Sequence, residues 1–212
     1  RMPFEVRHMG SKYPIFSFDF TGAKRGVLPA SYDYLRLEGR MQYRLNLPPI
    51  GYSQLMLEGG KIFGKVPYLL LKLHEGNGTY FYDRYAFSCM NFYEFSSDAW
   101  ISFFYEHHFN GFLLGRVPLL KKLNWREVFV FKGVYGTLSA RNDGSLPNTK
   151  AVMLFPVGMS SVEHPYLETG FGIENIFRLL RVDCIWRLTH HRAVPGLSIP
   201  TFTVNFSLNL KF

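Results

Sequence analysis

The segment from Thr201 to Phe212 reads TFTVNFSLNLKF and alternates apolar and polar residues without a break. Successive side chains of a β-strand point to opposite faces, so this segment predicts a strand with one apolar and one polar face. A tilted strand of about 9–11 residues spans a bilayer, whereas strands of globular proteins usually have roughly 5–6 residues. The pattern favours a membrane-spanning strand over an edge strand of a soluble sandwich. The side chains expected to face lipid are Phe202, Val204, Phe206, Leu208, Leu210 and Phe212.

The composition of the 212-residue chain fits a transmembrane β-barrel. Hydrophobic residues make up 47% and aromatic residues 17%, and such barrels carry aromatic girdles at both membrane interfaces. No apolar run approaches the roughly 20 residues of a membrane helix. The formal net charge is +8, but the basic residues are spread over the expected strands and loops. We therefore do not expect a nucleic-acid partner.

The two-residue period recurs in the segment 34–47, where one face carries charges and the other is apolar. A basic residue at mid-depth on the lipid face of a barrel costs about 2–4 kcal/mol. The charges are therefore expected to line a polar lumen. They are Arg36, Glu38, Arg40 and Arg44.

Eight strands are expected from this period. Between them, residues 64–98 form a long loop and residues 139–165 a polar surface loop, and the connections alternate roughly between short and long, as in barrels. The expected strands are 13–21, 34–47, 52–63, 100–109, 126–135, 166–175, 180–190 and 201–212.

The sixth and seventh of these strands are expected to form a hairpin. A turn at residues 177–178 would place Glu174 opposite Arg181 and Glu168 opposite Arg187. Opposite charges in register support the pairing, although a chain with this many charges matches some by chance. The charged residues on the luminal face of this hairpin are Glu168, Glu174, Arg181, Asp183 and Arg187.

The sequence carries no pattern typical of an active site. The neighbours His107 and His108 would point to opposite faces of a strand, so they cannot easily bind one metal ion. Cys89 and Cys184 have no metal-binding spacing, and Cys184 is expected on the lipid face, which argues against a disulfide. Neither a nucleophile elbow nor a phosphate loop is present. We expect no enzyme, metal or cofactor.

Four segments carry a resemblance to a known family: GNGTYFYDRYAFSCMNFYEFSSD at 76–98, HHFNGF at 107–112, PLLKKLNWRE at 118–127 and YLETGFGIENIFRLLRVDCIWRL at 166–188. They resemble the C-terminal β-barrel of a Bacteroidetes outer-membrane family of unknown function. Its full-length members begin with a carboxypeptidase-regulatory-like domain. The resemblance implies that residues 1–212 are the C-terminal portion of a longer exported protein.

That family is distantly similar to the surface-antigen superfamily, which includes the sixteen-stranded outer-membrane protein insertases. The resemblance implies an all-β, antiparallel transmembrane barrel, of which this chain supplies the second eight strands. In that superfamily an arginine at the tip of a lumen loop pairs with acidic residues on the following strands. Here Arg84 would take the tip position and Glu106 would be its partner. No glycine follows Arg84, and Lys132 stands where an acidic residue is expected, so a solvated loop position for Arg84 is the alternative.

The expected function follows from the resemblance. It implies an integral β-barrel of the bacterial outer membrane that assists membrane-protein assembly or translocation. A passive pore or transporter, and an accessory barrel subunit of a larger outer-membrane complex, are the alternatives. The expected partners are outer-membrane lipid and lipopolysaccharide, the barrel assembly machinery through the C-terminal strand, and other outer-membrane proteins.

Overall fold

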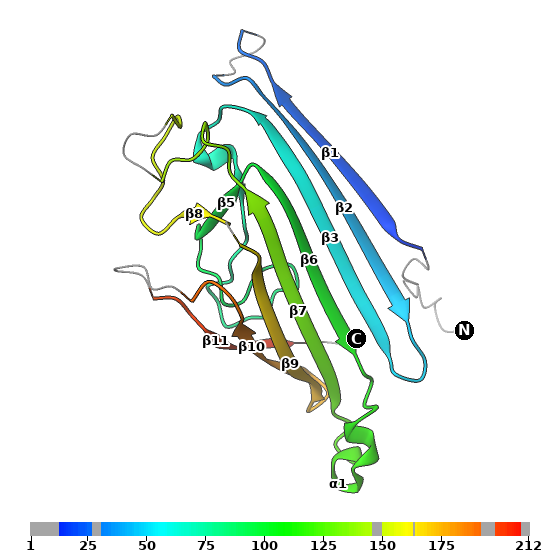
Figure 1. Cartoon of the computed structure of the whole chain (residues 1–212). Helices are drawn as coiled ribbons and strands as arrows, with labels where there is room; N and C mark the ends of the chain where they lie inside the picture. Colours follow the sequence, from blue (N-terminus) through cyan, green and yellow to red (C-terminus); the bar gives the residue numbers. More distant parts are fainter. Residues whose placement is uncertain (1–12, 27–30, 146–149, 163, 192–197, 209–212) are drawn as a thin grey trace, which may run out of the picture.

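The chain folds into one large antiparallel sheet of eight strands (Figure 1). The computed structural model describes residues 13–26, 31–145, 150–162, 164–191 and 198–208. Long strands that follow each other in sequence are neighbours in the sheet, so the topology is a simple meander. In sheet order the strands are β1 (Ile15–Ala23), β2 (Tyr34–Asn46), β3 (Tyr52–Gly64), β6 (Ala99–His108), β7 (Arg126–Thr137), β9 (Tyr166–Ile176), β10 (Leu180–Arg187) and β11 (Phe202–Leu208).

The eight strands match those expected from the alternation. The bounds differ by one or two residues for most of them, and β10 ends at Arg187, three residues before the expected end. The structure describes β11 as far as Leu208. Leu210 and Phe212, two of the expected lipid-facing residues, lie outside the described residues.

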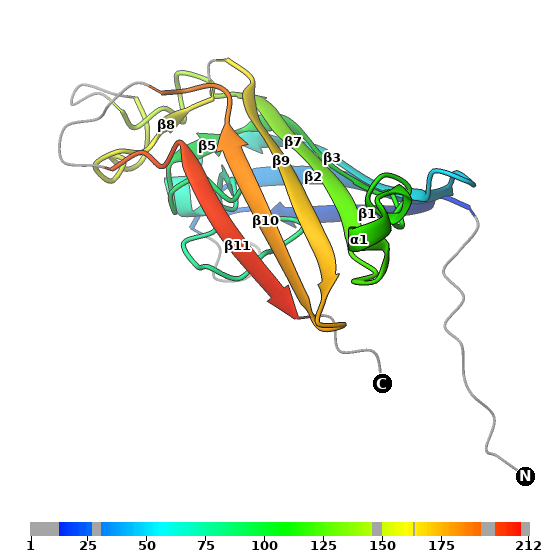
Figure 2. The ribbon, with the colours of Figure 1, turned by 90° about the horizontal axis from the view of Figure 1, so that it is seen from below.

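The sheet is strongly curved but open. β1 and β11 form its two edges, and in the described part of the chain they are not hydrogen-bonded to each other. Figure 2 shows β9, β10 and β11 curving in front of β1, β2 and β3. The sequence predicts that the chain supplies half of a sixteen-stranded barrel, and the described residues form an open sheet of eight strands that does not close on itself. What the structure shows is a curved all-β sheet with a concave and a convex face.

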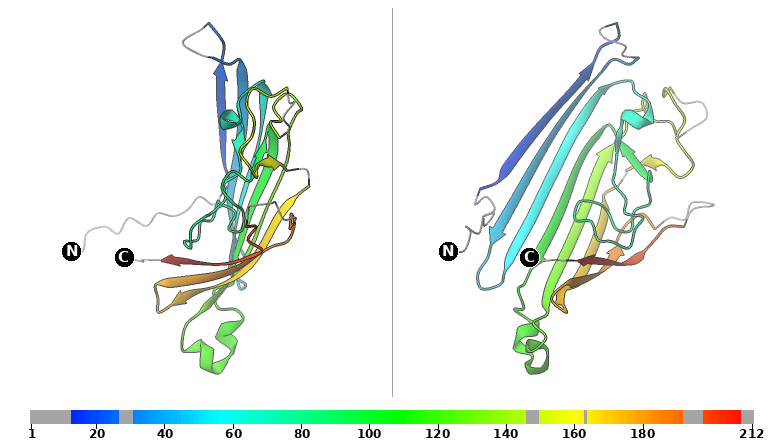
Figure 3. Two further views of the ribbon diagram at one scale, coloured as in Figure 1. Left: turned by 90° about the vertical axis from the view of Figure 1, so that its left-hand side faces the viewer. Right: turned by 180° about the vertical axis from the view of Figure 1, so that it is seen from behind.

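Two long connections pack on the concave side, and the first of them lies over the sheet (Figure 3). The first, residues 65–98, is called the inner loop below. It contains the 3-10 turn η1 (Tyr68–Leu70) and the short strands β4 (Lys72–Leu73) and β5 (Phe95–Ser97). The second contains β8 (Ser160–Ser161), which adds to β5 in parallel and completes a three-stranded sheet.

A hydrophobic core joins the inner loop to the concave face. The ring of Phe87 lies 5.1 Å from that of Phe104 on β6 and 5.3 Å from that of Tyr166 on β9, measured between centroids. Phe87, Met90 and Phe95 of the inner loop are all almost completely buried. Because full burial of such a side chain contributes about 1.5–3 kcal/mol, these contacts hold the inner loop against the sheet.

The convex face carries exposed apolar side chains. Phe18 is 69% exposed, Phe171 59% and Ile101 55%. Aromatic pairs bridge neighbouring strands on this face, as in Phe103 with Phe131 at 5.2 Å between ring centroids. Among the described residues, no helix has the length and apolar character that a membrane crossing requires.

The inner loop and the connection from β7 to β9 begin at one end of the sheet, and the short connections lie at the other end. β2 and β3 are joined there by residues 47–51, and β9 and β10 by a turn in which Phe177 and Arg178 both have positive φ. The segment between β6 and β7 lies at this same end (Figure 1) and forms η2 (Leu114–Arg116) and the single helical turn α1 (Pro118–Lys121). We call this the short-turn end, in contrast to the long-loop end.

Candidate functional site

Charged side chains gather on the concave face, beneath the inner loop. The structure places all the expected luminal charges on this face, but to different depths. Those on β2 remain partly accessible, and Arg44 lines a cavity at the short-turn end. Those on β9 and β10 are buried: Glu168 and Asp183 are 0% exposed, and Arg181 and Arg187 3%. A buried charge is costly unless it is paired, so the partners of these groups determine what the face can do.

Glu106 on β6 is the centre of the largest cluster. Its carboxylate lies 2.8 Å from Arg84 Nε of the inner loop, 3.3 Å from Arg181 Nη2 and 3.4 Å from His108 Nε2. The hydroxyl of Tyr82 also donates to it. The structure thus brings together Arg84 and Glu106, the two residues singled out in the sequence.

Tyr82 contacts three charged residues of this cluster. The Nζ of Lys132 lies 4.5 Å from the centroid of its ring, and the Arg181 guanidinium carbon lies 4.4 Å from it. Burial, reinforced by the negative charge of Glu106, raises the pKa of Tyr82 well above its usual value. The phenol therefore stays protonated and serves as a donor to Glu106.

Lys132 on β7 stands where the resemblance predicted an acidic residue, and it has a different role. It is completely buried, and its Nζ donates to the backbone carbonyls of Asp83 at 2.8 Å and Ala86 at 2.7 Å. The side chain thus fastens the inner loop through its main chain. The sequence does not reveal this role, because the acceptors are backbone carbonyls, which every residue carries.

The β9–β10 hairpin has the expected register over most of its length, but its charges pair elsewhere. Glu168 lies opposite Arg187, yet it accepts hydrogen bonds from the backbone N–H groups of Ser88 at 2.8 Å and Cys89 at 2.6 Å. Arg187 Nη2 instead contacts Glu94 Oε1 of the inner loop at 2.5 Å.

The second expected pair, Glu174 with Arg181, is not formed either. The register shifts between Leu180 and Val182. Arg181 Nε contacts Asp183 on its own strand at 2.8 Å, while Glu174 Oε2 lies 3.1 Å from His108 Nδ1. The hairpin charges therefore pair with the inner loop, with β6 or within β10. None of these ion pairs joins β9 to β10.

A smaller cluster holds the start of the inner loop against β2 and β3. Glu58 on β3 pairs with Arg40 at 2.8 Å and with Lys72 of β4. Glu38 lies 2.7 Å from Arg36 and 3.6 Å from Lys72. Lys72 thus bridges two strands of the main sheet, and this face of β2 is largely neutral except near Arg44.

The inner loop also occupies the free edge of β11. Phe206 donates its N–H to the carbonyl of Tyr80 at 2.7 Å and accepts the N–H of Tyr82 at 2.8 Å. The Asn205 side-chain amide donates to the Thr79 carbonyl at 3.1 Å. The loop therefore satisfies part of an edge that would otherwise expose unpaired backbone groups.

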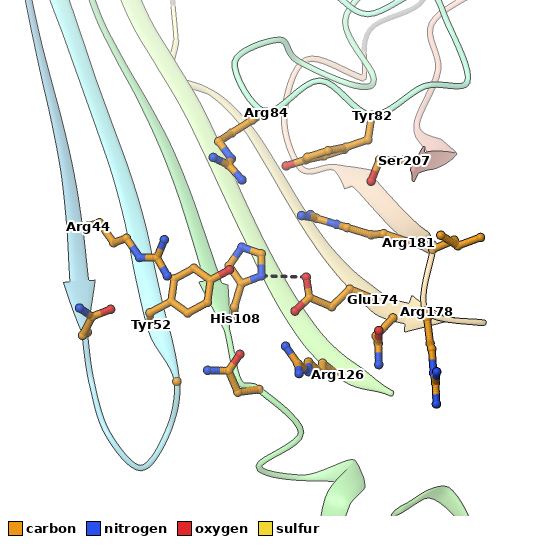
Figure 4. A pocket seen from close by; sticks show the side chains of 15 residues that line it. Arg44, Tyr52, Tyr82, Arg84, His108, Arg126, Glu174, Arg178, Arg181 and Ser207 are labelled. Carbon is orange, nitrogen blue, oxygen red and sulfur yellow. Dashed lines mark hydrogen bonds and ion pairs between the residues drawn. The ribbon is translucent and has the colours of Figure 1, made fainter. Parts of the chain in front are cut away.

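A cavity of about 700 Å³ opens at the short-turn end, and Tyr82, Arg84 and Arg181 of the Glu106 cluster line it (Figure 4). The Arg44 guanidinium lies 4.0 Å from the centroid of the Tyr52 ring, and Tyr52 stacks on His108 at 4.4 Å between centroids. Figure 4 shows Arg126 and Arg178 near the lower end of the same cavity, beside Glu174. We call this space the rim cavity; sequence reasoning did not predict it.

The described residues offer little for redox or metal chemistry. No group of three or more His, Cys, Asp and Glu among them is arranged to hold a metal ion. Cys89 and Cys184 are both free thiols. Burial raises the pKa of Cys89 to about 12, so its reactive thiolate is scarce near neutral pH.

Comparisons with known proteins place the chain in a family but assign no activity. A family model described as the C-terminal domain of a family of unknown function, DUF5686, matches residues 3–140. This range covers the inner loop, Glu106 and Lys132, and it ends before β9. No curated protein matches the chain. Because the match extends over more than half of the sequence, the chain belongs to this family of unknown function.

Proposed function

We propose that the chain forms part of the wall of a β-barrel in the bacterial outer membrane. The observation that carries this proposal is the division between the two faces of the sheet. Apolar side chains such as Phe18 and Phe171 are exposed on the convex face, while Glu106, Lys132 and Glu168 are buried on the concave face. A water-soluble sheet has the reverse arrangement, because burying apolar surface is the main driving force of folding.

The open edges fit a wall that is completed by further strands. β1 has no partner on its outer side in the described part of the chain, and almost all of its residues are exposed. A long, flat, apolar edge strand promotes aggregation unless it is paired. Strands from a first barrel half, as in the sixteen-stranded relatives suggested by the sequence, would provide that pairing.

The inner loop supports a role in membrane-protein assembly or translocation over a passive pore. An open pore needs a continuous aqueous lumen, whereas the loop fills much of the concave face and is fixed by Lys132, Glu168 and Arg187. The surface-antigen superfamily, which the sequence resembles, includes translocation and assembly factors with a loop in the lumen. An accessory barrel in a larger outer-membrane complex remains the second candidate, since its lumen need not conduct.

Location is tested by fractionating cells that express the full-length protein. The protein should remain in the outer-membrane fraction after alkaline extraction, because apolar strands hold it in the bilayer. Recovery in the soluble fraction as a folded protein would contradict the proposed location.

Function is tested by depleting the full-length protein and measuring other outer-membrane proteins by quantitative proteomics. An assembly or translocation factor should lower the levels of its client proteins. Unchanged levels, combined with a steady conductance of the purified protein in planar bilayers, would favour the pore. Unchanged levels with a stoichiometric co-purifying partner would favour the accessory role.

A further inference from the structure

Two cavities meet at the short-turn end of the sheet. The rim cavity adjoins a second cavity of about 710 Å³ beside α1. Both are lined by Arg126 at the start of β7 and by Arg178 in the β9–β10 turn. The two arginines therefore stand at the junction of the cavities, where a bound molecule can reach into both.

The rim cavity has an excess of positive charge. Arg84 and Arg181 are paired with Glu106, and the one carboxylate of its lining, Glu174, contacts His108. Arg44, Arg126 and Arg178 have no ion pair among the described residues. Guanidinium groups bind phosphate oxygens through paired, charge-assisted hydrogen bonds. Arg126 lies opposite Glu174 across β7 and β9, but Arg44 and Arg178 add positive charge that no further carboxylate of the lining balances. This excess of guanidinium groups creates a site for an anion.

The second cavity adds an apolar wall to this charge. Leu120, Trp125 and Leu179 line it, together with Lys121. The neighbouring turn residue Phe177 is 86% exposed. The backbone here is held in place, because the Asn175 side chain donates to the Asn124 carbonyl at 2.8 Å. Apolar and basic groups side by side suit a molecule with a phosphate at one end and a hydrocarbon chain at the other.

We propose that Arg126 and Arg178 bind the phosphate of an anionic phospholipid, with its hydrocarbon chain along Leu120, Trp125 and Leu179. The phosphate site stands on the charges and cavities alone. The lipid as its source rests on the proposed membrane location, in which the short turns of a barrel lie on the periplasmic side. The ligand would then come from the inner leaflet of the outer membrane.

Binding is measured by native mass spectrometry and titration calorimetry on the full-length protein in a non-ionic detergent. The probes are a short-chain phosphatidylglycerol, the matching phosphatidylcholine and inorganic phosphate. Phosphatidylglycerol should bind most tightly. The double variant Arg126→Gln/Arg178→Gln should bind it about tenfold more weakly or worse. Arg178→Gln alone, an exposed change in the turn, should show part of this loss without endangering the fold.

The matched control is Arg25→Gln/Arg141→Gln, which removes the same charge at the long-loop end and should bind like the wild type. Leu179→Ser should weaken phosphatidylglycerol binding and leave inorganic phosphate binding unchanged. Equal loss in the control, or no loss in the double variant, would overturn the site. Binding of inorganic phosphate with no gain for the lipid would overturn the lipid as its source. Cell fractionation tests the membrane location separately.

Discussion

At the scale of single residues, Lys132 carries the clearest prediction. Lys132→Met keeps the length of the side chain but removes the donors to the carbonyls of Asp83 and Ala86. It also leaves Glu168 and Glu106 with less positive charge nearby, so we expect a loss of about 2–4 kcal/mol in the free energy of unfolding. Denaturant unfolding of the full-length protein in lipid vesicles measures it. The control Lys150→Met, at an exposed site, should change stability by less than about 0.5 kcal/mol.

Gly172 provides a second residue-scale prediction, this time about space. It lies on the concave face of β9, where an added methyl group would overlap the Asp183 carboxylate and crowd the Val182 carbonyl. Gly172→Ala should therefore cost about 1–3 kcal/mol through overpacking and displace the Arg181–Asp183 pair. Gly115→Ala is the control, since nothing lies within 4 Å of its added methyl. Similar unfolding curves for the two variants would contradict this account.

At the scale of elements, His74 makes the seating of the inner loop sensitive to acid. Burial, with a smaller effect from Lys72, lowers the pKa of His74 to about 3. When the loop is displaced, His74 has the usual histidine pKa of about 6.5. Between about pH 3 and pH 6.5, His74 therefore binds a proton in the displaced state but not in the seated state. Seating is therefore strongest above about pH 6.5 and weakens below it, by roughly 2 kcal/mol at pH 5.

Hydrogen exchange of residues 72–97 at pH 7.5 and pH 5 measures this change. The exchange rates are first corrected for the intrinsic effect of pH. His74→Gln keeps a side chain that can bond Ser97, whose Oγ lies 2.9 Å from His74 Nε2, but it cannot titrate. The variant should show a smaller loss of protection on acidification. An unchanged loss would mean that other groups control the loop.

The strands were predictable from the sequence, whereas the partners of their charges were not. A strand repeats its environment every two residues, so alternation predicted all eight strands and their faces, although β10 ends three residues before its expected end. The inner loop has no such period, and its backbone supplies the acceptors for Lys132 and the donors for Glu168. Glu168 and Arg187 lie opposite each other as expected, but each finds its partner in the inner loop. The pairing of Glu174 with Arg181 was wrong because the register shifts between Leu180 and Val182. Arg84 and Glu106 were found through a resemblance, since spacing alone relates them to no common site.

At the scale of the whole molecule, closure depends on partners for both edges of the sheet. The edge of β11 is partly satisfied by Tyr80 and Tyr82 of the inner loop. The edge of β1 has no comparable cover in the described part of the chain. Closure on the β11 side would therefore require the loop segment to move from Phe206, while addition of strands to β1 would not. Pairing at the β11 edge must therefore displace the inner loop, whereas pairing at the β1 edge displaces no described segment.

The orientation of the whole wall in the membrane is tested by two adjacent substitutions on β11. Phe206 lies on the same face of the strand as Phe202, whereas Ser207 lines the rim cavity. Phe206→Arg would place a charge in hydrocarbon at a cost of about 2–4 kcal/mol near mid-depth, so we expect impaired insertion and less folded protein in the outer membrane. Ser207→Arg points into an aqueous space and should be tolerated. Because the two sites share the backbone and the edge of one strand, equal effects would show that the face assignment is wrong.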